Sequence, residues 1–194
     1  MKNITVFCGS NSGFRTEYAE AARTLARIFA RNNIRLIYGG GNVGLMGIIA
    51  DELMRAGGEV IGIIPDSLDK KEVGHRGITD LRVVGSMHER KALMAELADG
   101  FIAMPGGIGT FEEFFEILTW AQLGFHEKPC AILNIAGYYD GLLALCDNAV
   151  TEGFLRPAHR QLILEDSNPE FLLEKMRNLK PLPVEKWIDR EEEL

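Results

Sequence analysis

One arginine occupies a position where a helix would normally bury an apolar side chain. In the predicted helix 87–98 the apolar residues repeat at helical spacing, and Arg90 falls within their stripe, between Met94 and Leu97. A guanidinium on a buried face needs an anionic ligand or a structural carboxylate as its partner. Lys91 lies at the edge of the stripe and can reach the same place. Arg90 is therefore a candidate for a functional site, with an internal salt bridge as the alternative.

The next predicted helix, 111–123, carries a carboxylate at the margin of its apolar side. This residue is Glu113, and apolar neighbours raise the pKa of a carboxyl group, which suits acid–base catalysis. The alternative is a capping role, because Thr110 and Glu113 have the spacing of a capping box. Glu112 and Glu116 point to the polar face and are expected to be solvated.

Three glycine-rich loops, 8–13, 39–47 and 105–110, each follow a predicted strand and precede a predicted helix. Glycine allows a phosphate to approach the backbone, and a helix N-terminus supplies free N–H groups. The third loop has these features but lacks the Gly-Lys-Ser/Thr of a P-loop. The second contains the Gly-x-Gly-x-x-Gly spacing of dinucleotide enzymes without their acidic residue at the expected place; its glycines could also serve only in tight turns.

Short β-branched or apolar runs alternate with helical patterns along the chain. The predicted strands are 4–8, 34–38, 60–64, 81–84, 101–104 and 131–134, and the further predicted helices are 16–32, 43–56 and 139–152. This alternation predicts a single α/β, Rossmann-like domain over residues 1–180, a parallel sheet with helices on both faces. All three glycine loops should then lie on one rim of the sheet. Residues 181–194 are expected to form a lightly packed tail.

Composition and charge exclude several classes of protein. A chain of 194 residues with 46% hydrophobic residues can bury a core without disulfides or metal, and its net charge of −7 disfavours nucleic-acid polymers and anionic membranes. No apolar run is long enough to span a membrane. Three unpaired cysteines fit a reducing compartment, so a cytoplasmic location is expected. The four histidines lack the spacing of a zinc site, and we expect no metal.

The motifs together resemble those of one family. Residues 105–113 read PGGxGTxxE, and Met87-His88-Glu89-Arg90-Lys91 lies just upstream. Both resemble motifs of the LONELY GUY family, the cytokinin riboside 5′-monophosphate phosphoribohydrolases, which are often labelled possible lysine decarboxylases. The likeness extends from the Cys-Gly-Ser loop near the N-terminus to Gly137-Tyr138-Tyr139.

The resemblance implies a Rossmann-like homodimer that needs no cofactor. Its expected substrate is AMP or an N6-substituted AMP, which it would hydrolyse to the free base and ribose 5-phosphate. Arg90 and Glu113 match the family's catalytic residues. The substrate contacts that the resemblance implies are Glu72, Lys91, Gly107, Ile108, Gly109, Thr110, Phe111, Glu112 and Thr119.

Three other functions stay open from the sequence. A nucleotide sensor or cofactor carrier could use the same fold, although phosphate binding alone needs no carboxylate beside the site. A lysine decarboxylase would need a Schiff-base lysine for pyridoxal phosphate, and no lysine lies in an evident pocket motif. A nicotinamide-dependent enzyme is disfavoured by the missing acidic residue.

Overall fold

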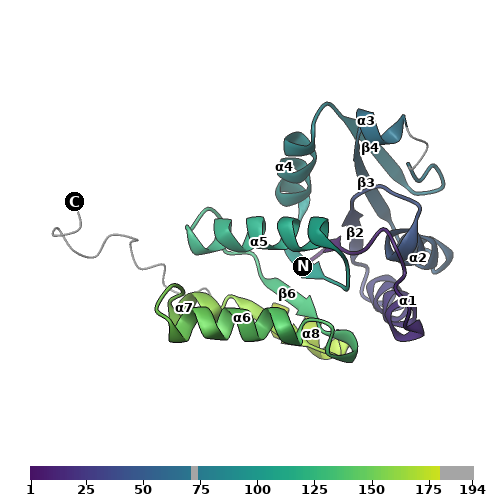
Figure 1. Ribbon diagram of the computed structural model, residues 1–194. Coiled ribbons are helices and arrows are strands. Elements are labelled where there is room, and N and C mark those ends of the chain that lie inside the picture. The colour runs from purple at the N-terminus through teal and green to yellow at the C-terminus, as the bar shows by residue number, and fades with distance from the viewer. Residues whose placement is uncertain (71–73, 180–194) are drawn as a thin grey trace.

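The computed structural model describes residues 1–70 and 74–179 of the chain. In these residues seven strands form one sheet in the order β4-β3-β2-β1-β5-β6-β7, with every neighbouring pair parallel (Figure 1). The strands are β1 (Asn3–Phe7), β2 (Arg35–Tyr38), β3 (Val60–Pro65), β4 (Asp80–Val84), β5 (Gly100–Ala103), β6 (Cys130–Leu133) and β7 (Ile163–Asp166). The predicted parallel α/β fold is confirmed.

The first six strands match the predicted runs to within one residue at each end, but β7 was not predicted. Interior strands of a parallel sheet are covered on both faces and read as continuous apolar runs. Strand β7 is an edge strand of four residues, Ile-Leu-Glu-Asp, in which only Ile163 is buried. It therefore lacks the pattern by which the other strands are recognised.

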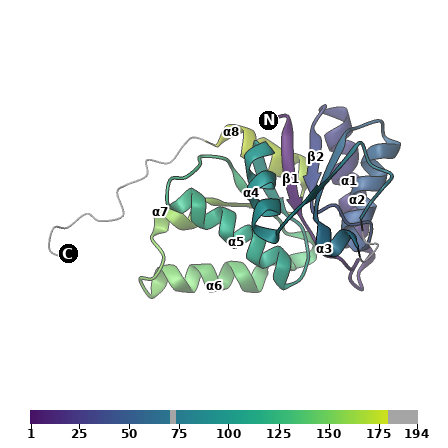
Figure 2. The same ribbon diagram turned by 90° about the horizontal axis from the view of Figure 1, so that it is seen from above.

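Helices cover both faces of the sheet (Figures 1 and 2). One face packs against α1 (Thr16–Arg31), α2 (Gly44–Arg55) and α8 (Pro169–Asn178), and the other against α4 (Met87–Leu97), α5 (Ile108–Gln122) and α6 (Asp140–Thr151). Short segments α3 (Asp66–Asp69), η1 (Ile135–Gly137) and α7 (Pro157–Arg160) complete the described chain. Helix α8 was not predicted either.

The apolar repeat in α1 shows how these layers are held. Ala22, Leu25 and Phe29 follow helical spacing, and all three are fully buried against the sheet. Removing a side chain such as Phe29 from water contributes roughly 1.5–3 kcal/mol. Burial of the apolar helix face thus stabilises its packing on the sheet. The loops at the strand ends can serve other roles.

The connectivity brings the three glycine loops together, as expected. They follow β2, β1 and β5, which are neighbours in the sheet, so the loops share the rim at the carboxyl ends of the strands. The chain leaves β1 toward β2 on one side, whereas β5 continues to β6 on the other. Ligands of open α/β sheets bind at such a switch in strand order.

Two predictions concern residues that lie outside the described ranges. The predicted tail, residues 181–194, lies outside them, as does Glu72. No helix in residues 1–70 or 74–179 is long and apolar enough to cross a membrane.

Candidate functional site

Helix α4 carries Arg90 into the interior, against the sheet. The helix begins as predicted, with the Ser86 hydroxyl oxygen accepting the Glu89 N–H at 3.1 Å. One turn later the Arg90 side chain is only 10% exposed, and its Nε donates to the carbonyl oxygen of Ile63 in β3 at 3.0 Å. Its Nη1 donates to Glu113 Oε1 at 2.7 Å. Arg90 therefore has the structural carboxylate partner that its buried position requires.

The second glycine loop is shaped by contacts within the chain. A Cβ atom on Gly39 would lie 1.9 Å from Arg90 Nη2, so only glycine leaves room for the guanidinium. Gly44 has a φ of +58°, and a Cβ there would lie 2.3 Å from the backbone of Ser10. These contacts account for the two glycines without a ligand and favour the turn interpretation of this loop over a dinucleotide site.

Glu113 does not cap its helix. We predicted that this helix begins at residue 111, which is wrong: α5 begins at Ile108 with Gly107 as its N-cap, and no side chain caps it. Glu113 lies more than one turn inside the helix, so the capping interpretation is wrong as well. The error arose because the glycines and isoleucine at 107–109 are weak helix formers, so the sequence pattern gave no reason to extend the helix over them.

The side chain of Glu113 is largely buried, with 12% of its surface exposed. Burial raises its pKa above the ordinary glutamate value, and the neighbouring Arg90 guanidinium opposes this rise. Burial also raises the pKa of the Cys8 thiol, and the charge of Glu113 adds to that rise. Glu113 is thus a buried carboxylate with a raised pKa and a single cationic partner, a combination typical of catalytic carboxylates.

Lys91 lies beside this pair and joins the same two helices. Its Nζ donates to Glu112 Oε1 at 2.5 Å and to Glu116 Oε1 at 2.9 Å. Burial lowers the Lys91 pKa, but the two carboxylates outweigh that effect and raise it. Glu112 is exposed as expected, at 53%, whereas Glu116 is only 26% exposed, so the expectation that it is solvated is wrong; α4 brings Lys91 within reach of both carboxylates.

The N-terminus of α5 has unpaired donors. The backbone N–H groups of residues 107–110 have no acceptor within the described part of the chain. A Cβ atom on Gly107 or Gly109 would meet nothing within 4 Å, and neither residue has a positive φ. Gly109 lies inside the helix, where glycine costs up to about 1 kcal/mol relative to alanine, and no contact with residues 1–70 or 74–179 requires it there. Free donors and open glycines together form a surface on which an anion can approach the backbone.

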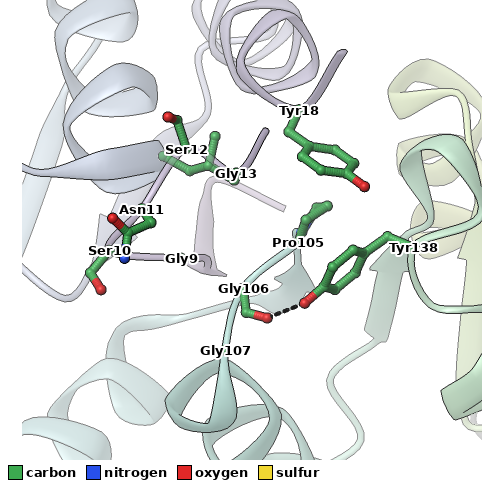
Figure 3. A pocket seen from close by; sticks show the side chains of 11 residues that line it. Gly9, Ser10, Asn11, Ser12, Gly13, Tyr18, Pro105, Gly106, Gly107 and Tyr138 are labelled. Carbon is green, nitrogen blue, oxygen red and sulfur yellow. Dashed lines mark hydrogen bonds between the residues drawn. The ribbon is translucent and has the colours of Figure 1, made fainter. Parts of the chain in front are cut away.

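A cavity of about 260 Å³ opens beside this helix end, at the switch between β1 and β5 (Figure 3). Its walls are residues 9–13 after β1, residues 105–107 after β5, and the side chains of Tyr18, Leu45 and Tyr138. Gly107 therefore belongs both to the cavity wall and to the α5 N-terminus. The first and third glycine loops meet at one site, as their predicted positions implied.

The remaining predicted site residues are placed as follows. Ile108 is exposed, Thr110 is buried against Gly106, and Phe111 packs edge-on against Tyr139 at a centroid distance of 6.0 Å. Thr119 donates to the Phe115 carbonyl oxygen of its own helix at 2.7 Å. At a rise of about 1.5 Å per residue it lies roughly 14 Å along α5 from Thr110, so one chain does not bring it to the helix N-terminus.

Some residues of the site carried no recognised signal in the sequence. Glu116 was seen as an exposed helix residue, yet it binds Lys91. Tyr138 contributed only to the family resemblance, yet it lines the cavity and donates to the Gly106 carbonyl oxygen. The aromatic pair at 138–139 directly after a glycine was the available signal.

Within residues 1–70 and 74–179 no three His, Cys, Asp or Glu side chains are grouped so that they could hold a metal ion. The three cysteines are free thiols and all are buried. His75 is bonded to Tyr38 and close to Asp51, and His126 to the Ile117 carbonyl oxygen. The described histidines therefore do not point to a metal centre.

Known proteins resemble this chain over most of its length. The family model described as "Possible lysine decarboxylase" matches residues 46–176. The chain is 51% identical over 164 residues to the cytokinin riboside 5′-monophosphate phosphoribohydrolase of Rhodococcoides fascians, which covers 84% of this chain and 83% of that protein. It is 47% identical over 181 residues to a probable enzyme of the same name from Oryza sativa subsp. japonica, covering 93% and 80% of the two chains.

Solved structures share the fold at lower sequence identity. The molybdenum cofactor binding protein of Rippkaea orientalis superposes with a TM-score of 0.68 at 23% identity, covering 91% of this chain and 96% of that one. The molybdenum cofactor carrier protein of Chlamydomonas reinhardtii gives 0.67 at 17% identity, covering 90% and 95%. At these identities the likeness shows the fold alone. The family model and the close relatives show more: the chain belongs to the LONELY GUY family of cytokinin riboside 5′-monophosphate phosphoribohydrolases, the family whose model is described as possible lysine decarboxylase.

Proposed function

We propose that this protein hydrolyses the N-glycosidic bond of an adenosine 5′-monophosphate, including N6-substituted forms, and releases the free base and ribose 5-phosphate. The names of its close relatives support this reaction. The observation that carries it in this chain is the buried Glu113 carboxylate, paired with Arg90, on the helix whose N-terminal donors are free. The helix N-terminus would bind the phosphate of a ribose 5-phosphate group, and the carboxylate on the same helix would act at the ribose carbon that carries the base.

The phosphate would bind at the N-terminus of α5. The N–H groups of Gly107, Ile108, Gly109 and Thr110 are unpaired donors, and the positive end of the helix dipole favours an anion there. Lys91 would add a positive charge from α4, with Glu112 exchanging its contact with Lys91 for one with substrate. These residues, with Phe111, Thr119 and Glu72, remain the proposed substrate contacts.

Glu113 would act on the ribose at the reacting carbon. Breaking the bond between C1′ and the base nitrogen leaves positive charge on the ribose ring, as in glycoside hydrolysis. The ionised Glu113 would stabilise that charge and accept a proton from the attacking water, whose oxygen forms the new bond to C1′. The departing base takes up a proton as it leaves. Arg90 would hold the Glu113 carboxylate in place and contribute to binding the ribose phosphate.

The geometry is less suited to the other functions. A Schiff-base lysine is activated by a lowered pKa, whereas the two carboxylates beside Lys91 raise its pKa and keep it protonated. A carrier or sensor of phosphate compounds would need the α5 N-terminus but not a buried carboxylate on the same helix. Pairing of Glu113 with Arg90 therefore favours hydrolysis over both.

The reaction is tested by incubating the purified protein with AMP and with isopentenyl-AMP and following free base and ribose 5-phosphate by chromatography. We expect equal amounts of base and ribose 5-phosphate from at least one of them, and loss of release in Glu113→Ala and Arg90→Ala. Nucleotide binding should survive in Glu113→Ala. Tight nucleotide binding by the wild type without any release would instead establish the sensor or carrier function.

We also propose that the protein is a cytoplasmic homodimer. Large apolar side chains exposed on and next to α4 and α5 support a second copy packing there: Met87, Ile108, Leu123 and Phe125. Three free thiols support a reducing compartment. Light scattering on the purified protein should give twice the chain mass of 21.6 kDa.

A further inference from the structure

Two consecutive tyrosines, Tyr138 and Tyr139, form hydrogen bonds to backbone carbonyl groups at the end of β5 and in the loop before α5. The Tyr139 hydroxyl donates to the Met104 carbonyl oxygen at 2.7 Å in the interior. The Tyr138 hydroxyl donates to the Gly106 carbonyl oxygen at the cavity wall (Figure 3). Their rings are nearly perpendicular, at 88°, with centroids 5.0 Å apart. Two carbonyls, two residues apart, are thus held by neighbouring side chains.

The backbone before the tyrosines is built to present them in this way. Ala136 and Gly137 have φ angles of +53° and +71°, a left-handed conformation that turns the chain sharply between β6 and α6. The Asn134 side chain then accepts the Tyr139 N–H at 2.8 Å and donates to Asp140 Oδ1 at 2.7 Å. Backbone conformation and the Asn134 hydrogen bonds therefore fix the turn on both sides of the tyrosine pair. The fixed backbone directs the two hydroxyl groups toward their carbonyl oxygens.

The bond to Gly106 decides how the next peptide unit faces. The chain has no cis peptide bond in the described residues, and in a trans peptide the C=O and N–H point in opposite directions. With the Gly106 carbonyl held toward Tyr138, the Gly107 N–H points to the other side of the loop. A peptide between two glycines rotates easily, because neither residue has a Cβ to restrict it. A rotated peptide would present a carbonyl oxygen to an anion in place of a donor.

We propose that Tyr138 is a positioning residue for phosphate binding, which keeps the Gly107 N–H available as a donor. The inference rests on the proposed function only in placing the substrate phosphate at the α5 N-terminus. Tyr138 acts through the Gly106–Gly107 peptide and need not touch the substrate. Its effect should therefore be confined to ligands that carry a phosphate.

Tyr18 offers a matched control in the same cavity. Its ring meets that of Tyr138 edge-on at 5.7 Å, and both side chains line the cavity (Figure 3). Unlike that of Tyr138, the Tyr18 hydroxyl has no hydrogen bond within the described part of the chain. Tyr18→Phe removes a hydroxyl from the cavity without releasing the Gly106 carbonyl.

The test is calorimetric titration of wild type, Tyr138→Phe and Tyr18→Phe with ribose 5-phosphate and with adenosine, which lacks the phosphate. Loss of one aligned hydrogen bond corresponds to about a fivefold change in affinity. We expect Tyr138→Phe to weaken ribose 5-phosphate about fivefold and to leave adenosine unchanged, and Tyr18→Phe to change neither.

Unchanged affinity of Tyr138→Phe for ribose 5-phosphate would overturn the positioning role, as would equal weakening of both ligands, which indicates a general structural effect. These outcomes leave the proposed hydrolysis intact. Conversely, a wild type that binds ribose 5-phosphate and releases no base overturns the hydrolysis, while the effect of Tyr138→Phe still decides the positioning role.

Discussion

Two groups of ion pairs join α4 to α5, and they differ in burial although their residues are neighbours in the sequence. Arg90 and Glu113 form the inner pair, with side chains 10% and 12% exposed. Lys91 forms the outer group with Glu112 and Glu116. The Lys91 side chain is 10% exposed, like that of Arg90, whereas the two glutamates are 53% and 26% exposed. The two groups therefore differ in their carboxylates: the one paired with Arg90 is enclosed, and those bound to Lys91 are more open to solvent.

The difference shows how one helix–helix contact can serve two functions. The inner pair is shielded from water, so its electrostatic interactions are strong and removal of one partner leaves a buried charge. In the outer group, Glu112 is the exposed member, and it can exchange its contact with Lys91 for one with solvent or a ligand at little cost, because ion pairs at exposed positions contribute only about 0.2–1 kcal/mol. We therefore assign chemistry to the inner pair and substrate binding to the outer group, and three predictions test this division.

The largest effect is expected for Arg90→Lys, which keeps the charge but not the planar fork of donors. A lysine cannot reach Ile63 and Glu113 with the geometry of the guanidinium. We expect turnover to fall about 100-fold and the free energy of unfolding to fall by about 3 kcal/mol. Base release and chemical denaturation measure the two effects.

An arginine in a more exposed ion pair provides the control for that variant. Arg160 Nε pairs with Asp147 Oδ1 at 2.7 Å, and the two side chains are 19% and 61% exposed. Arg160→Lys should change the free energy of unfolding by less than about 0.5 kcal/mol and leave turnover unaltered. If Arg90→Lys behaves like this control, the inner pair has no special role.

A smaller effect is expected for Lys91→Met, which keeps the length of the side chain and removes the charge. If the outer group binds the phosphate, KM should rise about tenfold with little change in kcat, which is the pattern of lost ground-state binding. Stability should fall as well, because the variant leaves the partly buried Glu116 without its cation, and chemical denaturation measures that loss separately. Initial rates over a range of nucleotide concentrations separate the two constants. A fall in kcat at constant KM would place Lys91 in the chemical step and abolish the division between the groups.

The smallest effect concerns the pH dependence of the wild type. In the proposed reaction Glu113 acts in its ionised form, so the rate should be present above the pKa of this carboxyl and be lost as the pH falls through it. Because burial raises that pKa, the loss should begin at a higher pH than for an ordinary glutamate. A profile of kcat/KM against pH measures this pKa. In the control variant Glu113→Gln, the residual rate should not show this fall at acidic pH. An acid limb at or below the ordinary glutamate value would show that Glu113 is not the group that titrates.

Much of the fold could be predicted because its signals are local. Interior strands such as β3 are continuous apolar runs, and α1 has a regular apolar face. Each can therefore be recognised from a short stretch of consecutive residues. Strand β7 escaped prediction because an edge strand carries a weaker pattern. Helix α8 was missed although its signals are present: Asn168 is its N-cap, Pro169 is its first residue, and Leu172, Leu173 and Met176 form its buried face. The start of α5 was misplaced because residues 107–109 have low helix propensity and are exposed, so neither propensity nor an apolar pattern marked them as helical.

The sequence by itself determined which residues could perform chemistry: an arginine in an apolar stripe, a glutamate at the margin of a second helix, and glycine loops at strand ends. Only the tertiary structure decided which of them meet. Arg90 lies 23 positions from Glu113, and Tyr138 lies 32 from Gly106. Such pairs form only when helices dock in one register on the sheet. That register is set by side-chain packing across the whole domain, which no local pattern contains.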